Sequence, residues 1–168
     1  MDMKKLAAAL CLTLAVLLGN ISWVHASSDT RMTPLVEIIN EFKSGPDTQE
    51  GCLHFLSLAG VRCGGFFGAM ASLTSNEQLA KVSMNMAQVT AVTESFGTKT
   101  DLVSAFEAAS EEVMRTKNRY RSIMISNNTL NGNYFKGSPL LDGDYSACKE
   151  MMPTMLDFVK RAGIPLIK

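Results

Sequence analysis

The sequence is poor in the residues that most metal centres and acid–base catalysts use. It contains two histidines and four cysteines among 168 residues. His54 is the only histidine beyond the N-terminal 26 residues, and Cys52, two positions earlier, would face another side of a helix. This composition argues against a Cys–His nucleophile pair and against a clustered zinc site. We therefore expect a protein that is not an enzyme, with no catalytic residue, no metal site and no cofactor.

The chain also lacks an excess of charge of either sign. It has 16 Lys and Arg and 16 Asp and Glu, so its formal net charge is zero. Nucleic-acid-binding domains usually carry a strongly basic face, so we expect no nucleic-acid partner. The densest basic segment, residues 115–121, is either a solvated helix face or a patch for an acidic partner.

The longest uncharged run lies at the N-terminus. Residues 6–19 are apolar, follow Lys4 and Lys5, and precede a Val-His-Ala motif that ends at Ala26. This pattern is typical of a secretory signal peptide that is cleaved after Ala26. An uncleaved membrane anchor is the alternative, but the run is shorter than the about 20 residues of a membrane span. We expect a protein exported to the periplasm or secreted, with one mature domain at 27–168.

Strand-type alternation is missing, and helical spacing takes its place. Apolar residues recur at intervals of three and four in five segments, which predicts helices. The segments begin near residues 33, 47, 75, 100 and 144 and end near residues 45, 73, 97, 123 and 163. The expected N-caps include Thr33, Asp47, Ser75 and Asp144. The fold class is therefore all-α, a single antiparallel bundle of four to five helices.

Two features interrupt this regularity. Pro153 falls inside the last helical segment, which predicts a kink or a restart there. Residues 127–144 are rich in Asn, Gly and Asp, which predicts a long polar loop. A loop of this length is either functional or mobile.

Glycines are concentrated in the second helical segment. Gly60, Gly64 and Gly68 are four residues apart and share one face of a helix that is apolar nearly all round. An interior glycine costs about 1 kcal/mol relative to alanine, and a close approach by a neighbouring helix can offset that cost. A bilayer span is the alternative, but it would place Arg62 near the membrane centre at a cost of about 2.5 to 3.5 kcal/mol. We expect a buried central helix, with no membrane span in the mature chain.

Arg62 is the one basic residue in the middle of this helix. A buried guanidinium needs an anionic partner, because an unpaired buried charge costs about 3 to 5 kcal/mol. We expect the partner to be a carboxylate near the start of the last helix, either Asp144 or Glu150.

Three cysteines remain once the leader is set aside, and export favours a disulfide. Cys52 and Cys63 share one helix and would be about 16 Å apart along its axis, too far to bond each other. In an up-down bundle the start of the last helix lies nearer Cys63. The sequence therefore predicts a Cys63–Cys148 bridge and leaves Cys52 as a buried free thiol.

These observations lead to a non-catalytic exported helical protein that binds another exported or envelope protein. It would act as a small periplasmic inhibitor, an immunity-type factor or an accessory of an envelope assembly. The alternative is a periplasmic carrier of a small ligand or of copper, because the chain has 11 methionines, including Met84, Met86 and several at 151–155. The candidate structural or interaction residues are Arg62, Asp144, Gly60, Gly64 and Gly68.

Overall fold

The computed structural model describes residues 32–44 and 48–168, which form five α-helices and contain no strand. The all-α expectation is confirmed for this part of the chain. The expected leader, residues 1–26, lies outside the described residues. The helices are α2 (Leu35–Ser44), α3 (Gln49–Thr74), α4 (Glu77–Thr98), α5 (Leu102–Asn131) and α6 (Pro139–Arg161).

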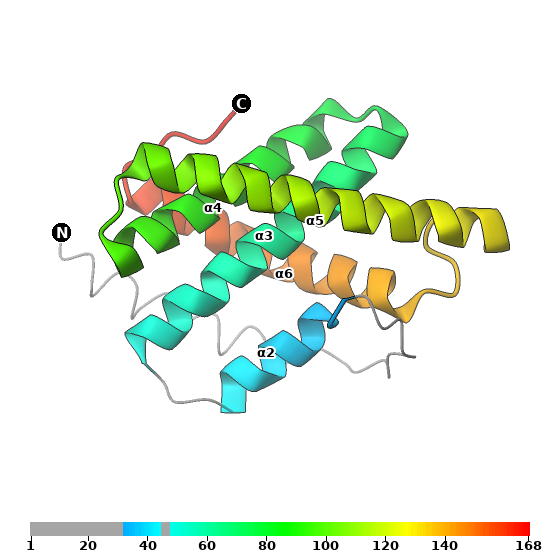
Figure 1. The fold of residues 1–168 in the computed structure, drawn as a ribbon, viewed down its shortest axis with the longest axis horizontal. Coiled ribbons are helices and arrows are strands. Elements are labelled where there is room, and N and C mark those ends of the chain that lie inside the picture. The colour runs from blue at the N-terminus through cyan, green and yellow to red at the C-terminus, as the bar shows by residue number, and fades with distance from the viewer. Residues whose placement is uncertain (1–31, 45–47) are drawn as a thin grey trace.

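The hairpin of α3 and α4 forms the middle of the molecule. In Figure 1, α5 crosses in front of this hairpin and α6 runs behind it, while α2 packs below against α3 and α6. Helix α3 contacts each of the other four helices, which explains why its sequence is apolar on nearly every side. It is long and apolar enough to cross a membrane, but 67% of its most apolar window is buried inside the protein.

The core is built on the expected three-four seam of α3. Its side chains at Cys52, Leu56 and Phe66 are at most 1% exposed. Helix α6 faces them with a second buried row, Met151, Met155, Phe158 and Val159.

The glycine face of α3 is where α4 and α5 approach it closely. A Cβ atom added to Gly60 would lie 2.4 Å from Thr90 Oγ1 of α4. One added to Gly64 would lie 3.0 Å from Val113 Cγ2 of α5. These two glycines therefore let both neighbours reach the α3 backbone, and Ser83 of α4 donates a hydrogen bond of 2.7 Å to the carbonyl of Gly64.

Gly65 is pressed harder against α5 than the glycines that the sequence singles out. A Cβ atom there would lie 2.5 Å from Thr116 Cγ2 and 2.8 Å from the backbone nitrogen of Lys117. The second of these neighbours is main chain, which cannot rotate away. Gly65 is not one of the three glycines that are four residues apart, so the sequence pattern did not indicate this contact, the tightest of α3 with α5.

The long polar loop expected at 127–144 is wrong. Helix α5 continues to Asn131, and α6 begins at Pro139 with Ser138 as its N-cap, so the connection is only 132–138. The side chain of Asn127 explains part of the difference, because its amide donates to the carbonyls of the loop and holds the loop against the last turns of α5. The three acceptors are Asn133, Tyr134 and Lys136, at 3.2, 2.8 and 3.2 Å.

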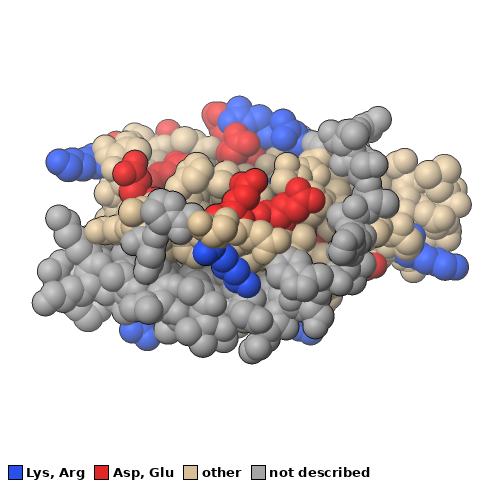
Figure 2. Space-filling view, turned by 90° about the horizontal axis from the view of Figure 1, so that it is seen from below, with Lys and Arg blue, Asp and Glu red and all other residues tan. Residues whose placement is uncertain are grey.

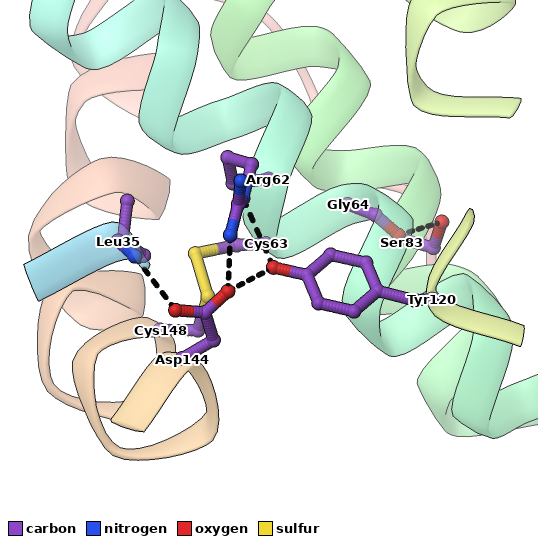
Figure 3. The surroundings of a disulfide bond; sticks show 8 residues. All are labelled: Leu35, Arg62, Cys63, Gly64, Ser83, Tyr120, Asp144 and Cys148. Atoms are coloured by element: carbon purple, nitrogen blue, oxygen red, sulfur yellow. Dashed lines mark hydrogen bonds and ion pairs between the residues drawn. A yellow bond between two sulfur atoms is a disulfide. The ribbon is translucent and has the colours of Figure 1, made fainter. Parts of the chain in front are cut away.

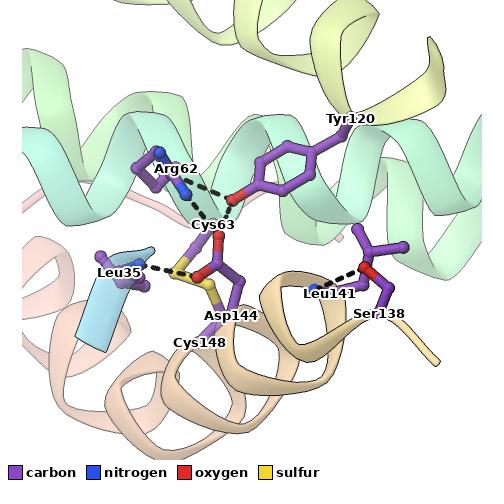
Figure 4. Close-up of polar contacts among 8 residues, drawn as sticks. All are labelled: Leu35, Arg62, Cys63, Tyr120, Ser138, Leu141, Asp144 and Cys148. Atoms are coloured by element: carbon purple, nitrogen blue, oxygen red, sulfur yellow. Dashed lines mark hydrogen bonds and ion pairs between the residues drawn. A yellow bond between two sulfur atoms is a disulfide. The ribbon is translucent and has the colours of Figure 1, made fainter. Parts of the chain in front are cut away.

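The prediction that Asp144 is the N-cap of the last helix is also wrong. Asp144 lies inside α6, after the capping contact in which Ser138 Oγ accepts from the backbone nitrogen of Leu141 (Figure 4). Its carboxylate instead accepts from the backbone nitrogen of Leu35, the first residue of α2, at 2.7 Å. Asp144 therefore satisfies one of the unpaired N–H groups of a different helix.

Three further local expectations need correction. Thr48 is the N-cap of α3, where its hydroxyl accepts from Gly51 N. Asn76 rather than Ser75 is the N-cap of α4, because Ser75 adopts the left-handed conformation that ends α3, with φ of 53°. Helix α6 runs unbroken past Pro153, so no new helix starts there.

The packing of Gly65 gives a stability prediction. We expect Gly65→Ala to lower the free energy of unfolding by about 2 to 3 kcal/mol, because the added methyl group overpacks a main-chain contact. The matched control is Gly143→Ala in α6, where an added Cβ meets nothing within 4 Å. That change should raise the stability by about 0.5 to 1 kcal/mol through helix propensity alone. Urea titration of both variants measures the difference, and equal effects would contradict the packing argument.

Candidate functional site

A buried polar cluster lies where α2, α3, α5 and α6 meet. It consists of Arg62 from α3, Tyr120 from α5 and Asp144 from α6, together with the backbone nitrogen of Leu35 (Figures 3 and 4). Tyr120 and Asp144 are 0% exposed and Arg62 is 9% exposed. Of the two expected partners of Arg62, the structure shows Asp144, which forms an ion pair with the guanidinium.

The polar atoms of this cluster are joined by four hydrogen bonds. Asp144 Oδ2 accepts from Arg62 Nη2 and from the Tyr120 hydroxyl, while Oδ1 accepts from Leu35 N. The Tyr120 hydroxyl in turn accepts from Arg62 Nε at 3.0 Å. Tyr120, which is 0% exposed, is a member of this cluster that the sequence did not indicate.

Burial determines the protonation of the tyrosine. Removal from water, and then the nearby Asp144 carboxylate, raise the pKa of Tyr120 well above its ordinary value of 10.0. Burial lowers the pKa of Arg62, but Tyr120 and Asp144 more than offset this and the net shift is upward. The cluster therefore holds a neutral phenol and a charged guanidinium where four helices meet.

The disulfide between Cys63 and Cys148 lies beside this cluster (Figure 3). It joins α3 to α6, with Cα atoms 5.3 Å apart, as the direction of the helices predicted. Cys63 follows Arg62 in the chain, and Cys148 lies one turn after Asp144. The bridge and the ion pair therefore secure the same contact between α3 and α6.

The expectation of a free thiol at Cys52 is wrong. Cys52 is disulfide-bonded, and its bond to the rest of the chain falls outside the described residues. Cys52 itself is 1% exposed at the start of α3, as expected.

A groove on the surface is the strongest candidate for a binding site. It lies between the C-terminal part of α3, the N-terminal half of α4 and the middle of α5, and its volume is about 540 Å³. Small residues form much of it, among them Gly68, Ala71, Ala80, Ser83 and Ala87. Met84 and Met114 also line it with side chains that are 49% and 51% exposed, so the groove is apolar and open to solvent.

Lys117 gives the groove its one positive charge. It comes from the basic segment 115–121, lines the groove, and forms no ion pair within the described part of the chain. Gly68 leaves room for its aliphatic stem, because a Cβ atom there would lie 3.3 Å from Lys117 Cδ. Gly68 thus belongs to the groove, whereas Gly60 and Gly64 lie under α4 and α5.

The other candidate residues do not come together as a site. His54 is exposed on α3. Met84 is 49% exposed and Met86 is fully buried, so these two methionines face different sides of α4. Among residues 32–44 and 48–168, no group of three or more His, Cys, Asp or Glu side chains could hold a metal ion.

Comparison of the chain with protein-family models, with curated proteins and with solved structures gave no match.

The buried cluster predicts a large loss of stability when one partner is removed. Arg62→Met leaves the Asp144 carboxylate buried without its cation, so we expect the free energy of unfolding to fall by about 3 to 5 kcal/mol. The double variant Arg62→Met with Asp144→Leu removes both charges and should recover part of this loss. Thermal melts of the three proteins decide, and an unchanged midpoint for Arg62→Met would show that the ion pair contributes nothing.

The raised pKa of Tyr120 predicts a loss of stability at high pH. The folded chain keeps the phenol proton above pH 10, whereas the unfolded chain releases it, so the contribution present below about pH 10 is lost as the pH rises. The free energy of unfolding should fall by about 1.4 kcal/mol per pH unit in this range. Tyr120→Phe should lack this part of the slope. Urea titrations between pH 9 and about pH 11 test it, and identical slopes for the two proteins would refute the assignment.

Proposed function

We propose that this chain is a non-catalytic exported protein that acts by binding another exported or envelope protein. The groove between α3, α4 and α5 receives an amphipathic helix of that partner. The observation that carries the proposal is an open apolar groove on the surface. Within residues 32–44 and 48–168, Gln88 Oε1 is the one buried side-chain nitrogen or oxygen without a hydrogen-bond partner.

The shape and chemistry of the groove support a helix as its occupant. Recognition of a helix in a groove uses an apolar cleft with anchor positions along its length. Met84 and Met114 offer flexible apolar contacts, which suit the bulky side chains of such a helix. Small residues keep the groove deep enough to take them.

Charge supports a partner that carries a carboxylate beside its apolar face. Lys117 would pair with that group, and a partly desolvated pair of this kind fixes register and orientation. Acidic side chains gather at the centre of the underside of the molecule, which Figure 2 shows. That face would repel the same carboxylate, whereas the groove has one acidic lining residue, Glu77, and one basic residue, Lys117, to receive it.

The Cys63–Cys148 disulfide supports the exported location, because such bonds persist mainly in oxidising compartments. The arrangement does not favour the copper carrier, since Met84 and Met86 face different sides of α4. A small apolar ligand remains the second candidate, because about 540 Å³ lies within the usual range of small-molecule pockets.

Site-specific crosslinking in the native host tests the proposal. A photoreactive residue in place of Met114 should crosslink to one partner protein through a helical segment. The matched control is Leu130, also on α5 and 79% exposed, but outside the groove. With the purified partner, Met114→Glu should weaken binding at least about tenfold, and Leu130→Glu should not.

A charge reversal at Lys117 tests the pairing with a carboxylate of the partner. Lys117→Glu should weaken binding, and replacing the facing carboxylate of the partner by Lys should restore it. Crosslinks to a small apolar molecule alone would favour the carrier. Equal crosslinking from Met114 and Leu130 would end the groove proposal.

A further inference from the structure

The segment that follows α6 lies on α4 through two side-chain amides. Asn85, which is 7% exposed, exchanges two hydrogen bonds with the backbone of Ile167. Ile167 N donates to Asn85 Oδ1 at 2.8 Å, and Asn85 Nδ2 donates to the Ile167 carbonyl at 3.3 Å. A residue on a neighbouring β-strand pairs with the backbone in the same two-bond pattern. Asn85 therefore binds the main chain of Ile167 and not its side chain.

Gln88 repeats this contact one helical turn later, but only half of it forms. Its Nε2 donates to the carbonyl of Pro165 at 3.2 Å. Its Oε1 is buried without a hydrogen-bond partner, and it is the only such buried side-chain atom within residues 32–44 and 48–168. An unpaired buried acceptor costs about 1 to 3 kcal/mol. The absence of a donor for Gln88 Oε1 therefore requires an explanation.

The cause is the identity of residue 165. In an extended chain, residues two apart present their N–H and C=O groups to the same side. Pro165 therefore stands to Gln88 as Ile167 stands to Asn85, but proline has no backbone N–H. A residue other than proline at this position would carry the backbone N–H that Pro165 lacks. The chain thus holds its own tail, residues 164–167, in a site that the tail does not fully satisfy.

An apolar cavity lies beside the unsatisfied amide. Its volume is about 240 Å³, and its walls include Gln88, Val92, Val103 and Phe106. Ile164 of the tail supplies one wall. Val103 is 70% exposed although it lines this cavity, so an added apolar side chain could cover it.

We propose that Asn85 and Gln88 form a binding site for an extended apolar segment of a partner protein, which displaces the tail. The segment presents a backbone N–H where Pro165 has none, and an apolar side chain to the cavity beside Gln88. The tail is then a weak self-ligand that keeps the site covered. The tail of a second copy carries the same proline and gains no bond at Gln88, so exchange between copies is not the use of this site. The proposal does not depend on the groove that faces α3.

The first test acts within the full chain. Pro165→Ala supplies the missing N–H but also loosens the free tail, so we compare it in two backgrounds. In the chain that keeps Gln88, Pro165→Ala should slow amide hydrogen exchange at Ile167. The slowing should be about fivefold greater than in the Gln88→Leu background, because one additional net hydrogen bond forms. Gln78→Leu, an exposed position on the same helix, serves as the matched control. Equal effects of Pro165→Ala with and without Gln88 would overturn the assignment.

The second test supplies the segment in trans to the full chain. The probes are a peptide of tail residues 163–168 and the same peptide with alanine in place of proline. The alanine peptide should bind about fivefold more tightly to the wild-type chain, and the difference should vanish in Gln88→Leu. Nuclear magnetic resonance of the Asn85 and Gln88 side-chain amides reports binding. Absence of any shift at millimolar peptide, or a dimer formed by tail exchange, would refute the proposal whatever the groove binds.

Discussion

The packing of four helices depends on the carboxylate of Asp144. It belongs to α6 and receives donors from the first backbone nitrogen of α2, the guanidinium of Arg62 in α3 and the hydroxyl of Tyr120 in α5. A buried carboxylate is costly unless its oxygens are bonded, so each of these helices is confined to a register that brings its donor to the same point. The constraint matters most for α5 and α6, which lie on opposite faces of the α3–α4 hairpin and hardly touch elsewhere. The disulfide one turn further along α6 then makes the contact with α3 covalent.

The sequence could predict those contacts that follow from helical period and chain direction. Cys63, Arg62 and the start of the last helix are brought together by an antiparallel arrangement whatever the details of packing, so the bridge and the ion pair could be inferred. The third member could not. Tyr120 comes from α5, and the depth at which α5 meets α3 decides what its hydroxyl reaches. Gly65 sets that depth, because only a residue without a side chain leaves room for the main chain of α5.

Local amino-acid composition predicted the helix ends wrongly where side chains from outside the segment supply the hydrogen bonds. Residues 127–131 look like loop because they are rich in Asn, yet they continue α5, since the Asn127 amide holds the following turn by three carbonyls. The Ser138-Pro139 start of α6 was present in the sequence, but the later Gly-Asp pair suggested a start at Asp144. Its carboxylate does cap a helix, α2, which lies far away in the chain.

Both proposed binding surfaces lie on α4 and its neighbours. The side chains of the Arg62–Tyr120–Asp144 cluster bond one another in the interior, so the cluster holds the fold together. Within the described part of the chain, the Lys117 ammonium over the groove forms no ion pair, and the Gln88 oxygen beneath the tail has no hydrogen-bond partner. Phe106 of α5 is a wall of both cavities, so the two surfaces adjoin one another along α4 and α5. The disulfide and the ion pair fix the helices that form these two surfaces. Binding at either surface would therefore cost little conformational entropy, because the helices are ordered in advance.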